Sequence, residues 1–193
     1  MKIGIDISQT AFEGTGVAEY TKKLVETILK LDAENEYLLF FAGFSQNSIR
    51  RLADKIQNKL KPAGAQSSKY SITSFRIPLN LLEFLWNRLH IIPIEWLIGK
   101  VDVFFTSDWL EPPAVKAKKI TTIHDLSIFK TPESFDKKII EVHKRKLQWV
   151  KKESDLIICD SLATKKDAMD ILGIEEKRLR IVYPGGGGNV NCR

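Results

Sequence analysis

Short, nearly continuous apolar runs recur along this chain of 193 residues, and amphipathic segments separate them. The runs have the length of strands, and most lack the apolar–polar alternation of a strand with one solvated face. They span residues 2–7, 36–42, 70–75, 101–107, 119–125, 155–161 and 179–184. The spacing of apolar residues predicts helices over 17–31, 48–60, 79–98, 134–153 and 162–172, with a break at Pro93. This order predicts an α/β fold, a Rossmann-like, doubly wound and mostly parallel sheet between two helix layers.

One such unit accounts for residues 1–184. Residues 185–193 read GGGGNVNCR and have no core-forming pattern, so we expect a flexible glycine-rich tail or a truncated interdomain linker there. Cys159 in an apolar run and Cys192 in the tail make no disulfide framework, which favours a reducing, cytoplasmic location. Polar and charged residues interrupt the longest apolar region, so no membrane-spanning helix is expected.

Gly14 and Gly16 lie where the first strand gives way to a helix. A loop of this kind can present backbone N–H groups at a helix N-terminus, where anions bind, and glycine lets a ligand approach the backbone closely. We therefore treat both glycines as candidates for binding a phosphate group. A loop that needs a positive φ explains the same glycines equally well. Asp6, at the end of the strand, is expected to cap N–H groups of the loop.

Several polar residues follow other predicted strands. His124 and Asp125 end the run 119–125, while Asp108 and Glu111 follow 101–107. Ligands of doubly wound folds bind outside the carboxyl ends of the strands, so His124 is a candidate catalytic residue that donates a hydrogen bond to a hydroxyl, a phosphate oxygen or a developing charge. A histidine whose hydrogen bonds are satisfied inside the fold is the alternative. Asp108, Glu111 and Asp125 are candidates for contacting a ligand at the same strand ends.

The other two histidines, His90 and His143, lie in helical patterns and are expected to be structural. No set of histidines, cysteines and carboxylates has the spacing of metal ligands, so no metal is expected.

The net charge of +6 is concentrated between residues 116 and 152. Such a stretch favours phosphorylated ligands, anionic lipid headgroups or nucleic acid, although a solvated helix face explains it as well. Aromatic residues do not alternate with the basic ones, which makes nucleic acid unlikely. The segment 79–98 carries Trp86 and Trp96 among aliphatic residues, and it suits either the core or a membrane interface.

Taken in order, six segments resemble the N-terminal half of a family 4 glycosyltransferase. They are KIGIDIS, GTGVAEYTKKLVETIL, LLEFLWNRLHIIP, VDVFFTSDWLEPP, TIHDLSIFKTPESF and SDLIICDSLATKKDAMDILGIEEKRLRIVYPG. The resemblance covers about residues 1–185, and the pairs TIHDLS with PESF and CDS with RIVYPG are its most specific parts. It implies the GT-B architecture, in which two Rossmann-like domains face each other across a cleft.

The resemblance also implies a function. Such enzymes transfer a sugar from a UDP- or GDP-linked donor to a sugar or lipid-linked acceptor, with retention of configuration and no metal or other cofactor. Gly16 matches the glycine beside the donor phosphates, and His124 matches a histidine that contacts the transferred sugar. By their positions beside these two, Gly14 becomes a further candidate for the donor phosphates, and Asp108, Glu111 and Asp125 become candidates on the acceptor side. Nothing matches the donor-binding domain, so we expect an acceptor-side domain that is inactive alone. Its expected location is the cytoplasm, with peripheral contact to the inner face of the membrane as an option that the sequence leaves open. The alternative is a stand-alone binding or regulatory domain that partners a separately encoded C-terminal half.

Overall fold

The computed structural model describes residues 1–43, 50, 51, 53, 54, 69–106 and 109–184. Within them a seven-stranded sheet has the order β3-β2-β1-β4-β5-β6-β7, and every pairing is parallel. The strands are β1 (Lys2–Asp6), β2 (Glu36–Ala42), β3 (Lys69–Phe75), β4 (Val103–Phe105), β5 (Lys118–Ile123), β6 (Leu156–Cys159) and β7 (Leu179–Ile181). The predicted Rossmann-like α/β fold is thereby confirmed.

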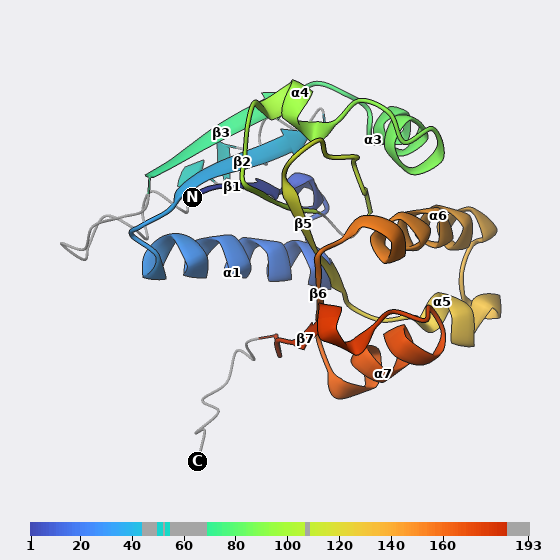
Figure 1. The fold of residues 1–193 in the computed structure, drawn as a ribbon. Coiled ribbons are helices and arrows are strands. Elements are labelled where there is room, and N and C mark those ends of the chain that lie inside the picture. The colour runs from blue at the N-terminus through green and yellow to red at the C-terminus, as the bar shows by residue number, and fades with distance from the viewer. Residues whose placement is uncertain (44–49, 52, 55–68, 107–108, 185–193) are drawn as a thin grey trace, which may run out of the picture.

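Helices cover both faces of this sheet, as Figure 1 shows. One face carries α1 (Gly16–Leu31), and the other carries the helices that follow β3, β5 and β6. These are α3 (Leu79–Leu82) with a π-helical extension (Glu83–Arg88), α4 (Ile94–Ile98), α6 (Lys137–Glu153) and α7 (Leu162–Asp170). The short helix α5 (Ser127–Lys130) follows β5, and single 3₁₀ turns occupy Ser8–Ala11, Pro132–Ser134 and Glu176–Arg178.

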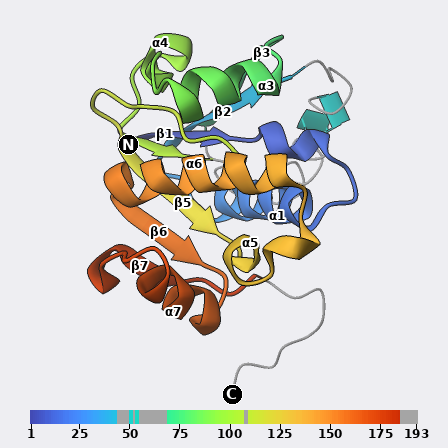
Figure 2. The ribbon, with the colours of Figure 1, turned by 90° about the vertical axis from the view of Figure 1, so that its right-hand side faces the viewer.

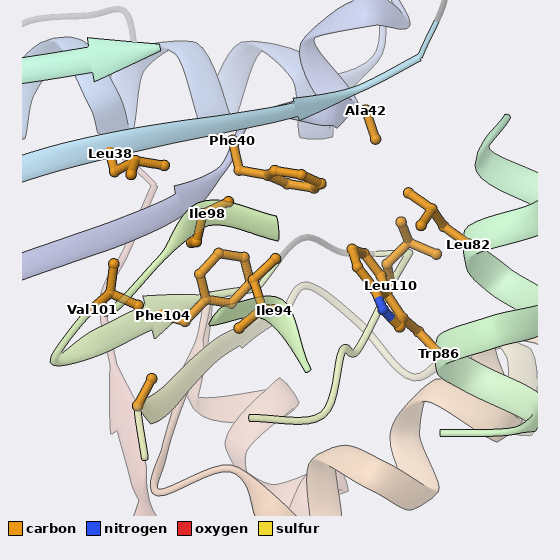
Figure 3. Close-up of a cluster of buried hydrophobic side chains, with 11 residues drawn as sticks. Leu38, Phe40, Ala42, Leu82, Trp86, Ile94, Ile98, Val101, Phe104 and Leu110 are labelled. Atoms are coloured by element: carbon orange, nitrogen blue, oxygen red, sulfur yellow. The ribbon is translucent and has the colours of Figure 1, made fainter. Parts of the chain in front are cut away.

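The interior strand β2 shows why the sheet needs two helix layers. Its side chains are buried from Tyr37 to Ala42 on both faces. Leu38, Phe40 and Ala42 pack with Trp86 and the other residues of the α3–α4 layer (Figure 3). The alternate residues pack against α1 in a second cluster, which includes Val25 and Leu29. A continuous apolar run is therefore required here because neither face of the strand meets water.

The strand order reverses between β1 and β4, which are neighbours in the sheet but not in sequence. Connections on the two sides of this point run to opposite faces, so the loops at the carboxyl ends diverge and leave a crevice. Figure 2 shows β5 and β6 running side by side toward α5, with α6 lying across them. The residues that follow β1, β5 and β6 therefore meet at one edge of the sheet.

Polar side chains fix the starts of the three long helices at this edge. The hydroxyl of Thr15 accepts from the Ala18 N–H, the carboxylate of Asp136 from the Lys138 N–H, and the hydroxyl of Ser161 from the Thr164 N–H. These N-caps satisfy donors that the first turn of a helix leaves without partners. Gly173 ends the turn after α7 with a φ of +64°, and its N–H donates to the backbone oxygen of Met169 at 3.0 Å.

Two sequence predictions need correction in detail. The helix predicted over 79–98 breaks before Pro93, because the π-helical stretch ends at Arg88 and both His90 and Ile92 have a positive φ. His90 therefore lies in a loop and not in a helix. Most of the helix predicted over 48–60, and the whole tail 185–193, lie outside the described residues.

Candidate functional site

The side chains of His124 and Asp160 meet at the carboxyl edge of the sheet. Ile123 at the end of β5 pairs with Cys159 at the end of β6. The residues that follow them, His124 and Asp160, therefore lie side by side. Nδ1 of His124 is 2.6 Å from Oδ2 of Asp160. A carboxylate only accepts hydrogen bonds, so we assign the proton to Nδ1, which leaves Nε2 of a neutral ring as an acceptor. Asp160 thus fixes both the orientation and the tautomer of His124.

Two further side chains hold this histidine. The ring of Tyr20, on α1, meets the His124 ring edge-on, with centroids 4.9 Å apart and planes at 84°. The hydroxyl of Tyr20 lies 3.2 Å from that of Thr122. Burial raises the pKa of Tyr20, and the nearby negative charge of Asp160 adds to this, so the phenol stays protonated. On the other side Thr164 donates its hydroxyl to the backbone oxygen of His124 at 3.0 Å.

The start of α1 lies beside this pair. Gly14 has a φ of +85°, a conformation that glycine adopts without strain, so this glycine is explained by the turn itself. A Cβ would meet no atom within 4 Å at either glycine, but Gly16 differs in that its φ is not positive. The chain's own packing therefore does not require a glycine at 16, and the space above it is open. The next residue, Val17, lines a cavity together with His124.

This cavity has a volume of about 160 Å³ and lies between the end of β5, the start of α1 and α6. Besides Val17 and His124, its lining comprises Thr122, Ile123, Asp125, His143, Lys146 and Leu147. Asp125 is exposed, and its Oδ1 accepts from the backbone N–H of Ser127 at 2.8 Å. The structure therefore brings Gly16, His124 and Asp125 to one edge, as the sequence predicted.

The acceptor-side candidates on the loop after β4 are Glu111 and Asp108, and the structure does not place either of them at the cavity. Glu111 is completely buried, and its carboxylate accepts from the hydroxyls of Thr106 at 2.8 Å and Ser154 at 3.3 Å. Contact with an acceptor does not fit this placement, because no atom of Glu111 reaches the surface. Asp108 lies outside the described residues. Asp6 behaves as expected, since its Oδ1 accepts from the Ser8 N–H at 2.8 Å and shapes the loop after β1.

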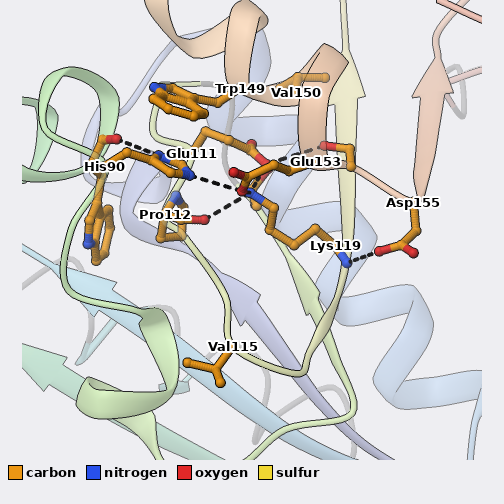
Figure 4. A network of polar contacts seen from close by, with 12 residues as sticks. His90, Glu111, Pro112, Val115, Lys119, Trp149, Val150, Glu153 and Asp155 are labelled. Atoms are coloured by element: carbon orange, nitrogen blue, oxygen red, sulfur yellow. Dashed lines mark hydrogen bonds and ion pairs between the residues drawn. The ribbon is translucent and has the colours of Figure 1, made fainter.

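Glu111 belongs to a structural network that also contains Lys119 of the basic stretch and His90 (Figure 4). Nζ of Lys119 lies 3.0 Å from Glu111 and 2.9 Å from Glu153. Nε2 of His90 is 2.9 Å from the same Glu153, and its ring stacks on Trp149 with centroids 3.5 Å apart. Burial raises the pKa of Glu153, but the bonds from His90 and Lys119 outweigh burial and lower it. The structural role expected for His90 follows from these contacts.

The basic stretch 116–152 is not one open surface, contrary to the simplest expectation from the charge pattern. Lys119 and Lys146 are buried, with 2% and 1% of their surface exposed. Arg145 pairs with Glu83 at 2.9 Å across to the π-helical stretch. Part of the charge therefore organises the interior, and only the remainder can meet external anions.

Cys159 is buried at the end of β6. Burial, with the charge of Asp160 as a second cause, raises the pKa of its thiol to about 11. The thiolate is the reactive form of cysteine, so this residue is a packing group and not a nucleophile.

Sequence reasoning missed Tyr20, Lys146 and, as a partner of His124, Asp160. Asp160 could have been found, because two adjacent parallel strands that end in register place their next residues together. Tyr20 and Lys146 carry no such signal, since each depends on how a helix docks on the sheet.

Within the described part of the chain, no group of three histidine, cysteine or carboxylate residues is arranged to hold a metal ion. Nor does any helix found there have the length and apolarity needed to cross a membrane.

Comparison with known proteins finds similarity to solved structures, one of which is described here. No protein-family model matches the chain, and no curated protein matches it either. A solved structure described as Anabaena Alr3699/HepE in complex with UDP is similar over 96% of this chain, with a TM-score of 0.48 and 12% sequence identity. The chain spans 44% of the length of that structure.

Proposed function

We propose that this chain is the acceptor-side domain of a retaining, nucleotide-sugar-dependent glycosyltransferase of the family 4, GT-B type. The observation that carries the proposal is the His124–Asp160 pair, which lies beside the open start of α1 at the carboxyl edge of the sheet. The ordered resemblance of six sequence segments to that family supports it independently. A Rossmann-like sheet alone would not, because the fold serves many functions.

Each residue of the pair and the helix start has a defined part in this proposal. The diphosphate of a UDP- or GDP-sugar lies against the backbone at Gly16, where side chains are absent and the helix N-terminus attracts anions. His124 hydrogen-bonds the transferred sugar or the reacting centre. Asp160 holds its ring and stabilises positive charge on it as the transition state develops. Asp125, exposed at the rim, accepts from acceptor hydroxyls.

A second Rossmann-like domain completes the proposed enzyme. Departure of a nucleoside diphosphate requires cationic groups on the phosphates. No such cluster lines the cavity at His124 in the described part of the chain, where Lys146 is the single cation. The proposal places these groups on the second domain, whether in the same polypeptide or separately encoded, so the chain alone binds donors weakly and turns over slowly.

Peripheral contact with an anionic membrane is part of the proposal. Exposed apolar side chains follow one another along the α3–α4 layer: Leu81, Phe84, Leu89, Ile91 and Trp96. Trp96, which is 75% exposed, borders a groove that also contains Lys100 and Lys116. An aromatic ring beside lysines suits the headgroup region of an anionic bilayer. Cosedimentation with phosphatidylglycerol vesicles should fall for Trp96→Ala. Equal cosedimentation of the variant and the wild type would show that this surface does not contact the membrane.

A thermal-shift screen tests the main proposal. Nucleotide-sugars and glycan or lipid-like acceptors are added singly to the chain, and the midpoint of unfolding is followed. Ligands that bind only the folded state raise this midpoint according to their affinity. We expect acceptors to raise it more than UDP- or GDP-sugars do. Strong stabilisation by a nucleotide-sugar alone would contradict the division of labour, and no response to either class would favour an unrelated binding module.

A further inference from the structure

Lys146 is a buried cation without an acidic partner among the described residues. It lies on α6 with 1% of its surface exposed, and Nζ donates to the hydroxyl of Thr121 at 3.2 Å. No carboxylate of the described chain lies within ion-pair distance of it. An ammonium group carries three donors and a full charge, and burying such a charge unpaired is costly. One hydroxyl satisfies one of the three donors.

The other buried lysine of this region shows what a satisfied ammonium looks like. Lys119, on β5, contacts the carboxylates of Glu111 and Glu153 and the backbone oxygen of Pro112, all within 3.0 Å. Its charge is balanced and its three donors are used. Lys146 packs against the same face of the same strand but has none of these partners. Among the described residues, therefore, no group balances the charge of Lys146, and two of its donors are open to a bound anion.

Lys146 lines the cavity of about 160 Å³ that also contains His124 and Asp125. This volume is several times that needed for one water molecule, and it can admit a single oxyanion group. It is too small for a nucleotide-sugar. His143, three residues before Lys146 on α6, lines the same cavity. Lys146 therefore reaches this cavity from α6, next to the proposed reaction centre.

We propose that Lys146 binds the anionic group of the acceptor, a phosphate carried on the molecule that receives the sugar. This inference rests on the proposed function, because it names the substrate class of the same site. The phosphate enters between β5 and α6 and takes the unused donors of Lys146, as charge-assisted hydrogen bonds are stronger than neutral ones. A hydroxyl of the same molecule then lies toward Asp125 and His124. The diphosphate of the donor stays at Gly16.

The test follows the ε-carbon NMR signal of Lys146 in the chain labelled with ¹³C-lysine. The probes are inorganic phosphate, glucose 1-phosphate and dihexanoyl phosphatidylinositol, which separate a free phosphate, a soluble sugar phosphate and a lipid headgroup. Glucose and UDP serve as comparisons. We expect a saturable shift of the Lys146 signal with the phosphorylated probes and none with glucose, and the tightest probe identifies the source of the phosphate.

Two matched variants complete this test. Lys146→Met should weaken binding of the best probe about tenfold or more, since it removes a charged hydrogen bond. Lys144→Met changes an exposed lysine of the same helix and should bind as the wild type does. If Lys146→Met does not fold, the shift of the wild-type signal decides alone. A Lys146 signal that no phosphorylated probe moves, or unchanged binding by Lys146→Met, overturns the inference.

The nucleotide experiments keep the two proposals apart. If UDP moves the Lys146 signal as strongly as the best probe, the phosphate site belongs to the donor and the assignment to the acceptor is overturned. If nucleotide-sugars perturb Gly16 and His124 while no phosphate perturbs Lys146, the proposed function stands and this inference fails. If phosphate binds Lys146 but nothing responds at Gly16 and His124, the anion site stands and its assignment to a glycosyl acceptor fails.

Discussion

Nδ1 of His124 lies 2.6 Å from Oδ2 of Asp160, and each residue is the first beyond the end of its strand. The contact arises from the register of β5 and β6, because Ile123 and Cys159 are paired at the two strand ends. The second oxygen of Asp160 is buried and accepts no hydrogen bond from the described residues. The negative charge is therefore directed at the imidazole, which suits a group that must carry positive charge transiently.

Asp160→Ala should release the ring of His124. In the wild type we expect ¹⁵N NMR to show the proton of the neutral ring on Nδ1, because the carboxylate accepts it. Without Asp160 the tautomer is no longer fixed, and the Nδ1 and Nε2 signals should average. Asp125→Ala is the control, since the carboxylate of Asp125 bonds the Ser127 N–H and not the ring. A wild-type tautomer pattern in Asp160→Ala would show that other contacts orient the ring.

Gly4 and Gly16 should respond differently to alanine. A Cβ at Gly4 would approach Cδ2 of Phe104 to 2.7 Å, so Gly4→Ala forces the core apart and should cost about 1–3 kcal/mol of unfolding free energy. A Cβ at Gly16 meets nothing, and alanine suits a helix better than glycine, so Gly16→Ala should unfold at the same or a higher urea concentration. We nevertheless expect Gly16→Ala to bind nucleotides less well. Weakened folding in Gly16→Ala would instead assign this glycine a structural role.

Lys119→Met should be among the most destabilising single changes in the chain. It removes the cation between Glu111 and Glu153 and leaves buried negative charge uncompensated, a loss of about 3–5 kcal/mol. Lys118→Met is the matched control, because Lys118 forms its ion pair with Asp155 at the exposed surface and should matter little. Urea unfolding of both variants measures the difference. Equal midpoints would mean that the network contributes no more than a surface pair.

Glu95 should make folding stability depend on pH. Its carboxylate accepts from the backbone N–H groups of Val115, Lys116 and Ala117. Burial raises the pKa of Glu95, but these bonds outweigh burial and lower it. A lowered pKa in the folded state stabilises the protein above the unfolded pKa of about 4.3, and this contribution is lost as pH falls through the folded value.

Glu95→Gln tests that dependence. Its unfolding free energy should fall below that of the wild type at pH 7, and the gap should narrow as the pH is lowered below about 4, where the wild-type carboxyl group takes up its proton. Urea unfolding at both pH values measures the gap. A gap of constant size would show that the charge of Glu95 does not stabilise the turn 115–117.

The sequence was sufficient for the fold because burial on both sheet faces leaves a direct pattern. The run 36–42 is predicted and observed with the same bounds, since all but its first residue are buried. The helix predicted over 79–98 was too long, because apolar spacing does not reveal a chain that turns back through positive φ at His90 and Ile92.

The candidate site was predictable only where strand ends define it. His124 and Asp125 follow directly from the end of β5. Glu111 also follows a predicted strand, but its carboxylate is buried against Lys119. No local sequence pattern predicts this burial. Lys146 was hidden in a basic stretch, because its burial depends on how α6 crosses the sheet.

Mapping a nucleotide-sugar onto the chain by ¹H–¹⁵N NMR tests the central claim most directly. UDP-glucose and GDP-mannose are titrated into the labelled chain, and amide and His124 ring signals are followed residue by residue. We predict weak, saturable shifts concentrated at Gly14–Gly16, His124 and Asp160, and reduced shifts in Gly16→Ala. Shifts confined to another face, or none at these residues at any concentration reached, would contradict it.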